Sequence, residues 1–483
     1  MLSLALALIL AAAPQDAERP PSFVYILADD LGYGELGCYG QERIRTPNLD
    51  RLAAEGMRFT QHYSGSPVCA PSRCTLLTGL HTGHAAIRDN DEMGERGDVW
   101  HDPELEGQRP IPDQTVTLGE ILQGAGYRTA AIGKWGLGWT GSEGDPNRQG
   151  FDHWFGYICQ RVAHNYYPTH LWRNGEKVPL QNEPFFPHQK LPPDADPLDP
   201  ASYAPFRGRD YAADFLIEEA LRFVREHRDR PFFLYFATPV PHLALQVPED
   251  SLAEYEGAFE EKPYLGGRGY LPHPTPRAAY AAMITRMDRD VGRLLDLLEE
   301  LGLAENTLVM FSSDNGPSWV GGVDLEFFQS TGGLRGRKAQ VWEGGIRVPM
   351  IARWPGRIPP GTVSAHVSAF WDVLPTLCEA AGVEPGVCTD GISFLPTLLG
   401  RPEEQREHDY LYWEHAGRQQ AVRIGRWKAL RLRPSAPIQL FDLEADPAET
   451  TDLAAEHPAL VEAAAHLFRT VRTENPWFPL RTD

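Results

Sequence analysis

Between residues 23 and 311, short runs of apolar residues alternate with segments in which apolar residues recur every three or four positions. The apolar runs predict buried strands at 23–28, 129–132, 231–237 and 307–311. The periodic segments predict helices at 49–56, 116–124, 212–227 and 280–302. Because strands and helices alternate in this order, we expect an α/β fold with a largely parallel sheet and helices on both faces.

The pattern changes after about residue 405. Short runs there predict antiparallel strands at 420–424, 427–432 and 438–441, followed by a helix at 457–471. The chain has 483 residues, which is more than one hydrophobic core usually supports. We therefore expect a large α/β domain at 21–404 and a small α+β domain at 405–483.

The chain begins MLSLALALILAAAPQD, an apolar run that ends in small residues. Such a run is too short to span a bilayer and is typical of a signal peptide, here 1–20, although the usual basic residues before it are missing. A misassigned start is the alternative. No Asn-x-Ser/Thr sequon occurs, which fits a bacterial protein exported to the periplasm or the medium. No later segment resembles a transmembrane helix, so no stable membrane insertion is expected.

Charge and cysteine content exclude several classes of protein. The 45 basic and 66 acidic side chains give a formal net charge of -21, which argues against a nucleic-acid partner. An anionic substrate would therefore have to meet a local basic pocket. The six cysteines contain no CxxC pair, which excludes a zinc ribbon and a dense disulfide scaffold. Cys378 with Cys388, and Cys69 with Cys74, are the most closely spaced pairs.

Two predicted strands end in groups of oxygen-bearing side chains. Asp29 and Asp30 follow the first strand, and Asp314 and Asn315 follow the strand at 307–311. The carboxyl ends of strands in open α/β sheets line the ligand crevice. Three carboxylates and an amide there suit a hard divalent cation such as calcium or magnesium. Either pair alone could be ordinary turn chemistry, but the two together favour a metal site.

The stretch SPVCAPSRCTLLTGL places Cys69 at the start of a predicted helix and Arg73 one turn later. Cys69 could be a small buried apolar residue, as most free cysteines are. It could also be a catalytic thiol, because a helix N-terminus and a nearby arginine lower a thiol pKa. A hard cation is a poor match for a soft sulfur nucleophile. The spacing alone leaves these alternatives open.

The motif Cys69-Ala70-Pro71-Ser72-Arg73, continuing through Leu77-Thr78-Gly79, resembles the signature of the type I sulfatases in the alkaline phosphatase superfamily. The resemblance runs from about residue 22 to the C-terminus. It implies a large mixed sheet between helices and a smaller C-terminal α+β domain. The other matching elements are Asp29-Asp30, Gly133-Lys134-Trp135, Pro241-His242, Asp314-Asn315-Gly316, Lys338 and Glu343-Gly344-Gly345-Ile346-Arg347-Val348-Pro349.

The resemblance implies that a maturation enzyme converts Cys69 to formylglycine, whose aldehyde hydrate attacks the sulfur of a sulfate ester. Asp29, Asp30, Asp314 and Asn315 would hold the divalent cation, with calcium favoured over magnesium. Arg73 would orient the hydrate. Lys134 and Lys338 would bind the sulfate oxygens. His242 would protonate the leaving alcohol, with help from Lys338.

The family commonly has the motif Gly-Lys-Trp-His-Leu-Gly, whose histidine assists sulfate elimination. This chain has Gly136 at the position of that histidine. The base for that step is therefore open, and His81, His84 and His164 are candidate substitutes. A lone histidine is more often structural.

The segment 159–176 and the loop that begins at residue 88 combine aromatic and hydrogen-bonding side chains. Such groups over a crevice suit a sugar ring, although they could equally pack the loops themselves. We expect a sulfated carbohydrate substrate rather than a small aryl sulfate ester, which would serve as an artificial substrate. The candidate substrate-binding residues are Arg88, Arg161, His164 and Asn165. The stretches 88–113 and 176–208 are expected to be long loops.

Two other functions stay open at this point. A phosphate or phosphonate monoester hydrolase of the same superfamily could use the same nucleophile on phosphorus. A non-catalytic relative could keep the pocket and bind sulfated glycans without turnover, and Gly136 is the only support for that alternative.

Overall fold

The computed structural model describes residues 19–94, 102 and 105–481. Within these residues, eleven strands form one large mixed sheet and four form a small antiparallel sheet. The strands of the large sheet are β1 (Ser22–Ala28), β2 (Met57–Tyr63), β3 (Arg128–Lys134), β4 (His153–Tyr157), β5 (His170–Arg173), β6 (Glu176–Pro179), β7 (Phe232–Ala237), β8 (Thr307–Ser313), β9 (Arg347–Arg353), β10 (Thr362–Ser364) and β11 (Ser368–Ala369). Those of the small sheet are β12 (Leu411–His415), β13 (Gln419–Ile424), β14 (Trp427–Arg431) and β15 (Gln439–Asp442).

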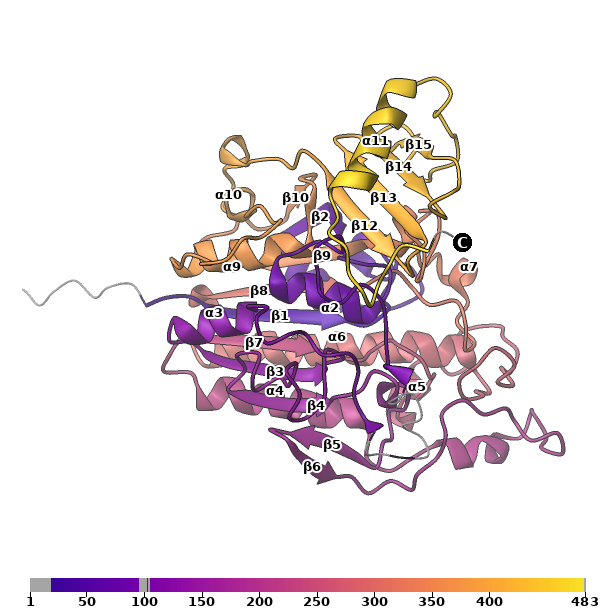
Figure 1. The fold of residues 1–483 in the computed structure, drawn as a ribbon. Helices are drawn as coiled ribbons and strands as arrows, with labels where there is room; N and C mark the ends of the chain where they lie inside the picture. Colours follow the sequence, from indigo (N-terminus) through magenta and orange to yellow (C-terminus); the bar gives the residue numbers. More distant parts are fainter. Residues whose placement is uncertain (1–18, 95–101, 103–104, 482–483) are drawn as a thin grey trace, which may run out of the picture.

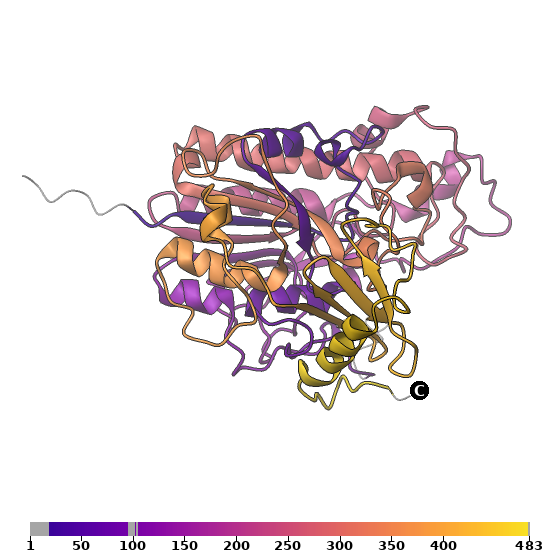
Figure 2. The ribbon, with the colours of Figure 1, turned by 90° about the horizontal axis from the view of Figure 1, so that it is seen from above.

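The α-helices are α1 (Pro47–Ala54), α2 (Cys69–Thr78), α3 (Leu118–Gly124), α4 (Ala212–Glu226), α5 (Glu249–Leu252), α6 (Pro276–Glu300), α7 (Leu325–Phe328), α8 (Glu343–Ile346), α9 (Val373–Ala381), α10 (Leu395–Leu398) and α11 (Pro458–Thr470). Helices α2, α3 and α9 cover one face of the large sheet, and α1, α4 and α6 cover the other (Figures 1 and 2). This arrangement confirms the predicted α/β class.

The four predicted strands of the large domain form the centre of the sheet, whose order is β10-β2-β9-β8-β1-β7-β3-β4-β5-β6 with β11 beside β2. β1 is parallel to β7 and β8, and β3 is parallel to β7 and β4. The carboxyl ends of these strands point to the right in Figure 1. β9 is antiparallel to both of its neighbours, and β5 and β6 are antiparallel too, so the sheet is mixed.

β2 and β9 were not predicted, and their sequences explain why. β2 reads MRFTQHY and is only partly buried, so it gives no continuous apolar run. β9 contains Pro349, which cannot donate to a ladder and usually argues against a central strand. The structure places Pro349 at an irregularity in the pairing, where β2 shifts register between Phe59 and His62. A bulge of this kind is one of the places where a sheet tolerates proline.

The small sheet lies between α11 and the large domain (Figure 1). One of its faces packs Tyr412 and Val422 against Phe468 of α11. The other face packs Trp413 against Tyr63 and Trp371 of the large domain. β12 adds a strand to the three that were predicted. The assignment of residues 405–483 to a domain of their own stays a prediction.

A buried ion cluster joins the two sheets. Lys428 Nζ lies 2.9 Å from Glu343 Oε1 and 3.0 Å from Glu449 Oε1, and all three side chains are inaccessible to solvent. Tyr63 donates a hydrogen bond to Glu343 at 2.7 Å. Glu343 begins the segment 343–349, one of the elements that resemble the sulfatase family, so this part of the motif attaches the small sheet to the large one.

Residues 1–18 of the predicted signal peptide lie outside the described residues, as does part of the predicted loop at 88–113. The predicted loop at 176–208 contains β6 and a short 3-10 helix, Pro200–Phe206. In the described parts of the chain, no helix is long and apolar enough to cross a membrane. All six cysteines, including the closely spaced pairs, are free thiols.

His62 of β2 is fully buried among Phe59, Phe370 and Phe394, and its Nδ1 lies 2.8 Å from Ser368 Oγ. Burial lowers its pKa from 6.5 to about 3. The unfolded chain therefore binds one more proton than the folded chain at pH values between these two, and the folded state loses stability as the pH falls from about 6.5 towards 3.

Replacing His62 with phenylalanine is expected to reduce the pH dependence of the unfolding free energy by about 1.4 kcal/mol per pH unit between pH 4 and 6. Denaturant unfolding at several pH values measures this slope. Ser368→Ala is the matched control, because it removes the same hydrogen bond but keeps the imidazole. An unchanged slope in His62→Phe would show that His62 does not titrate in this way.

Candidate active site

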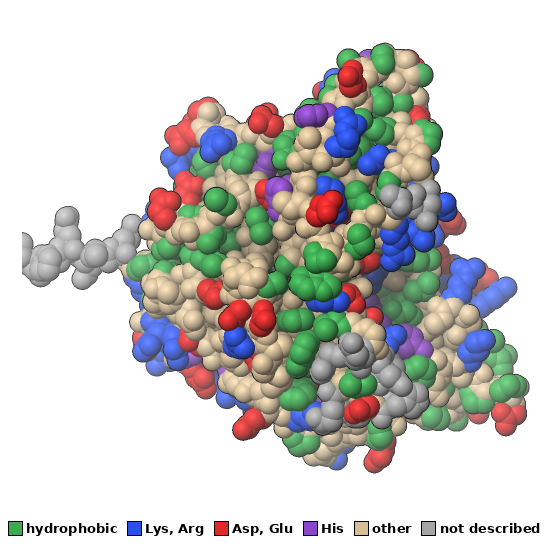
Figure 3. Space-filling model, viewed as in Figure 1, with side chains coloured by type: hydrophobic (Ala, Val, Ile, Leu, Met, Phe, Trp, Pro, Cys, Tyr) green, Lys and Arg blue, Asp and Glu red, His purple; other side chains and the backbone are tan. Residues whose placement is uncertain are grey.

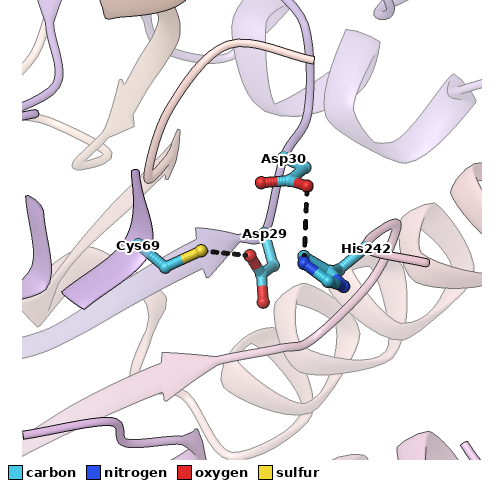
Figure 4. Close-up of side chains that lie close together, drawn as sticks. All are labelled: Asp29, Asp30, Cys69 and His242. Carbon is cyan, nitrogen blue, oxygen red and sulfur yellow. Dashed lines mark hydrogen bonds and ion pairs between the residues drawn. The ribbon is translucent and has the colours of Figure 1, made fainter. Parts of the chain in front are cut away.

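The carboxyl ends of β1 and β8 bring together the four predicted metal ligands. Ala28 pairs with Ser313 in the parallel ladder, so the residues that follow lie side by side. Asp30 N donates to Asp314 Oδ1 at 3.1 Å, and Asn315 Nδ2 donates to Asp30 Oδ1 at 2.7 Å. Figure 4 shows Asp29 and Asp30 facing the same space as the side chains of Cys69 and His242.

The donor set fits a hard divalent cation. Asp29, Asp30 and Asp314 are at most 1% exposed, and Asn315 is fully buried. Asn315 Oδ1 has no hydrogen-bond partner, although its amide nitrogen donates twice. A buried carbonyl oxygen without a donor, beside three buried carboxylates, has the chemistry of a ligand for a hard cation.

Helix α2 positions Cys69 and Arg73. All ten residues of this helix are buried, and the two side chains share one face because they are four residues apart. Cys69 Sγ lies 3.5 Å from Asp29 Oδ1. The Arg73 guanidinium donates to Asp314 Oδ2 through Nε at 3.1 Å and through a terminal nitrogen at 2.8 Å, and to Lys134 O at 2.6 Å. Arg73 thereby holds β3, β8 and α2 in a fixed arrangement.

Two lysines bind carboxylates of the cluster. Lys134 Nζ, at the end of β3, lies 2.5 Å from Asp29 Oδ2 and 3.5 Å from Cys69 Sγ. Lys338 Nζ lies 2.8 Å from Asp30 Oδ2. Burial lowers the pKa of each lysine, but the neighbouring aspartates outweigh burial and hold both pKa values above the usual range. Both side chains are therefore cations, and that of Lys134 lies against the thiol.

The sulfur itself is not set up as a thiolate. Burial raises the pKa of the Cys69 thiol to about 12, although Lys134 and Lys338 oppose the shift. Among the carboxyl groups, burial and the charge of Asp29 raise the pKa of Asp314 above its usual value despite Arg73.

His242 presents one ring nitrogen to the cluster. Its Nδ1 donates to Leu243 O at 2.7 Å, which leaves Nε2 facing Asp30 Oδ2 at 3.6 Å (Figure 4). Burial, followed by the charge of Lys338, lowers the pKa of His242 to about 4. The ring of His164 stacks on the ring of His242 with centroids 4.9 Å apart, so His164 supports the orientation of His242.

The other predicted substrate-binding residues do not stack on His242 as His164 does. Arg161 is partly exposed, with its Nε 3.9 Å from Glu92 Oε1. Asn165 is buried, and its side-chain amide bonds both backbone groups of Tyr167. Arg88 is 3% exposed and binds Glu414 of β12 at 3.2 Å. The structure therefore gives Asn165 and Arg88 structural contacts and brings neither into the cluster.

Arg88 also donates to Thr473 O at 2.9 Å, so its guanidinium attaches the C-terminal segment to the large domain. His81 and His84 lie beyond the C-terminal end of α2, whereas Cys69 is at its N-terminal end, about 15 Å away for a ten-residue helix. Both of these histidines pair with Asp390. They are therefore not placed to act as the base that Gly136 leaves open.

Sequence analysis missed several residues of the site. The ring of Tyr270 lies 5.2 Å from that of His164 and 5.9 Å from that of His242. His188 Nε2 lies 3.0 Å from His164 Nδ1. Both residues come from loops without periodicity, so no sequence signal marked them. Asn90 Oδ1 accepts from Ala70 N at 2.9 Å beside the thiol, and its place in the loop that starts at residue 88 was the one available hint.

Gln160 fills the space beside Gly136. Gly136 has a φ of +78°, and a Cβ there would lie 2.5 Å from Gln160 Nε2. Gln160 Nε2 is itself buried without a hydrogen-bond partner. A side chain at residue 136, where the family pattern has a histidine, would therefore require Gln160 to move.

Comparison with known proteins agrees with this geometry. The sulfatase family model matches residues 21–383, which include every residue of the cluster. The chain belongs to the sulfatase family. A second family model, that of the C-terminal region of N-sulphoglucosamine sulphohydrolase, matches residues 337–474 of the sulfatase and so includes the small sheet.

The sulfatase is 35% identical to human arylsulfatase A over 478 residues, which cover 95% of this chain and 83% of that protein. It is 33% identical to N-acetylgalactosamine-6-sulfatase of Canis lupus familiaris over 426 residues, 86% of this chain and 72% of that one. The crystal structure of Ps i-CgsB in complex with k-i-k-neocarrahexaose superposes with a TM-score of 0.75 at 27% identity and 96% coverage of both chains. The chain is therefore an enzyme that hydrolyses sulfate esters.

Proposed function

We propose that this sulfatase hydrolyses sulfate esters of carbohydrates with a nucleophile made from Cys69. The observation that carries the proposal is the position of Cys69 Sγ, 3.5 Å from both Asp29 Oδ1 and Lys134 Nζ, between a carboxylate cluster and a cation. A relative with 33% identity is an N-acetylgalactosamine-6-sulfatase, and Ps i-CgsB was crystallised with a neocarrahexaose. Both names support a sugar sulfate as substrate.

In this mechanism Cys69 Sγ stands in for a hydroxyl oxygen of the formylglycine hydrate. Asp29, Asp30, Asp314 and Asn315 would hold the divalent cation, and oxygen ligands of this kind favour calcium, with magnesium as the alternative. A bound cation would neutralise sulfate charge and lower the pKa of a hydroxyl group beside it. Arg73, fixed by its bonds to Asp314, orients residue 69 on the same helix face.

The remaining steps use side chains of the cluster. Lys134 and Lys338 bind sulfate oxygens as one hydroxyl of the hydrate attacks sulfur and the ester S–O bond breaks. The attacking hydroxyl gives its proton to Asp29, whose Oδ1 lies 3.5 Å from Cys69 Sγ. His242 gives a proton to the leaving sugar oxygen, because the charge of the bound sulfate favours the imidazolium form. The second hydroxyl then gives its proton to a water molecule, the C–O bond to sulfate breaks, and the aldehyde forms again as sulfate leaves.

The test compares protein produced with and without a formylglycine-generating maturation enzyme. Peptide mass spectrometry should find a loss of about 18 Da at Cys69 in the first preparation, as a thiol becomes an aldehyde. Only that preparation should hydrolyse sulfate esters, and a chelator should remove the activity until calcium is restored. Equal activity in both preparations would contradict the proposal, and faster turnover of a matched phosphate ester would favour a phosphate or phosphonate hydrolase.

Gly136→His should destabilise the enzyme rather than supply the base that the family pattern expects. The left-handed φ costs a non-glycine residue about 1–2 kcal/mol, and the overlap with Gln160 adds about 1–3 kcal/mol. Thermal unfolding measures the loss. Gly141→His is the matched control, since Gly141 has a φ of +82° but no heavy atom within 4 Å of its Cβ position. Equal losses in the two variants would show that Gln160 does not block residue 136.

Export to the periplasm or the medium is also part of the proposal. The short apolar run that ends in Ala11-Ala12-Ala13, within the predicted signal peptide at 1–20, supports it. N-terminal sequencing of protein recovered from outside the cytoplasm would locate the cleavage site, and a chain that still begins at Met1 in the cytoplasm would contradict export.

A further inference from the structure

Lys338, which binds Asp30 in the cluster, lies in a segment that has no helix or strand of its own. Residues 329–342 connect α7 to α8. Within them, Gln340 N donates to Arg337 O at 3.1 Å, which closes a turn with Lys338 and Ala339 at its centre. No regular element fixes this turn, so the position of Lys338 Nζ depends on the contacts that hold residues 337–341.

Segments that follow β2 and β8 hold one side of the turn through backbone hydrogen bonds. Lys338 N donates to Pro317 O at 3.1 Å, and Ala339 N donates to Pro67 O at 2.9 Å. Both bonds use N–H groups of the turn. The carbonyl oxygen of Ala339 and the N–H group of Val341 therefore need partners from elsewhere.

The small sheet supplies both partners through one side chain. Gln419 Oε1 accepts from Val341 N at 3.2 Å, and Gln419 Nε2 donates to Ala339 O at 2.9 Å. Gln419 is the first residue of β13 and pairs with His415 of β12, so the hairpin fixes its backbone. An amide that bonds a backbone carbonyl and the N–H group two residues later holds that stretch as a paired strand would.

Ala339 needs this support because its backbone conformation is unfavourable. Its φ is +66°, in the left-handed region that a residue with a Cβ rarely adopts. Such a conformation persists only where the surrounding contacts hold it. The bond to Pro67 O holds the peptide group before Ala339, and the bond from Gln419 Nε2 holds the peptide group after it. Both bonds therefore oppose relaxation of the turn.

The small sheet also buries the far end of this stretch. Val341 is fully buried in the core between the two sheets, together with Trp413 of β12 and Ala421 of β13. Figure 3 shows a recess at the right of this face, below the small sheet, with Lys and Arg side chains on its rim. The small sheet thus lies beside the carboxyl ends of the strands that carry the cluster, where it can hold a residue of the cluster in place.

We propose that Gln419 is a positioning residue for the reaction: it holds residues 339–341 so that Lys338 Nζ stays on the cluster. The inference rests on the proposed function, in which Lys338 binds a sulfate oxygen. Within the described residues, the side-chain hydrogen bonds of Gln419 go to Ala339 and Val341 and to none of the clustered side chains. Gln419 is also uncharged, so it acts on the reaction through the position of this segment.

The experiment is a double-mutant cycle on converted, calcium-loaded enzyme with an aryl sulfate as the substrate. Gln419→Met removes both hydrogen bonds and keeps most of the side-chain volume. In the wild-type background it should lower kcat/KM about ten- to a hundredfold, the size expected for two lost hydrogen bonds. In the Lys338→Ala background it should lower kcat/KM by less than about twofold, because the side chain that Gln419 positions is already absent.

Gln405→Met is the matched control. Gln405 also bonds a backbone N–H group and a backbone carbonyl, those of Thr397 and Ser393, but it does so around α10. This variant should lose stability as Gln419→Met does and keep kcat/KM within about twofold of wild type. Where Gln419→Met does not fold, Gln419→Asn takes its place in the cycle, since it keeps the amide but withdraws it by one methylene group.

An equal loss from the Gln419 variant in both backgrounds would overturn the inference, as would no loss in either, and both results leave the proposed function intact. A converted wild type that hydrolyses no sulfate ester would instead contradict the proposed function. The inference is then decided on unconverted protein by hydrogen exchange of the Lys338 and Ala339 amides. Faster exchange in the Gln419 variant than in Gln405→Met would support it, and equal exchange would overturn it.

Discussion

Cys69→Ala is expected to lower turnover of an aryl sulfate by about 10⁴-fold or more, the size of effect seen when a catalytic nucleophile is removed. The thiol is 1% exposed and lies within 3.5 Å of Asp29 and Lys134, so no other side chain can take its place without moving one of them. Alanine removes only the sulfur, and the carboxylates and Arg73 keep their contacts. The variant should therefore fold and bind calcium like the unconverted wild type.

Cys74→Ala is the matched control for this experiment. Cys74 is a fully buried free thiol on the same helix, and its carbonyl accepts a hydrogen bond from Thr78 at the C-terminal end of α2. Its replacement should cost some stability and leave kcat close to that of the wild type. A loss of activity in Cys74→Ala as large as that in Cys69→Ala would point to disruption of α2 rather than loss of the nucleophile. Retention of activity in Cys69→Ala would contradict the proposed chemistry outright.

The strands that consist of a continuous buried apolar run could be predicted from the sequence. β1, β3, β7 and β8 are such runs, and they are the parallel strands whose ends carry Asp29, Lys134 and Asp314. Most of the cluster could be predicted because its residues lie at the ends of these strands or belong to α2. Lys338 and His242 lie in loops, and only the resemblance to the sulfatase family indicated them. β2 and β9 could not, because one alternates polar and apolar residues and the other contains Pro349 at an irregular pairing.

Side-chain roles that depend on distant contacts were beyond sequence reasoning. Arg88 is a basic residue in a loop, which made it a candidate for substrate binding. In the structure it pairs with Glu414, 326 residues later. Asn165 is polar and near the site, but its side-chain amide forms its hydrogen bonds with the backbone of Tyr167. Gln160 gave no signal at all, although it closes the space beside Gly136. In each case the deciding partner is fixed by the fold and not by local sequence.

Replacing His242 with glutamine is expected to separate substrates by their leaving group. Nδ1 of His242 donates to Leu243 O. The other ring nitrogen of His242, Nε2, is therefore the one that can protonate a departing oxygen in the cluster. A sugar alkoxide is strongly basic and needs that proton, so kcat for a sugar sulfate should fall by about 10²- to 10⁴-fold. A nitrophenolate leaves without one, so kcat for a nitrophenyl sulfate should fall by less than about tenfold.

The two substrates are assayed on the same preparation, so differences in folding or in conversion of Cys69 cancel. If His242 donates a proton only as the S–O bond breaks, KM for the sugar sulfate should change little while kcat carries the loss. Equal losses on both substrates would instead mean that His242 acts by holding Asp30, which lies 3.6 Å from its Nε2, or by stacking on His164. His164→Ala separates these two alternatives, because it removes the ring that stacks on His242 and leaves Asp30 untouched.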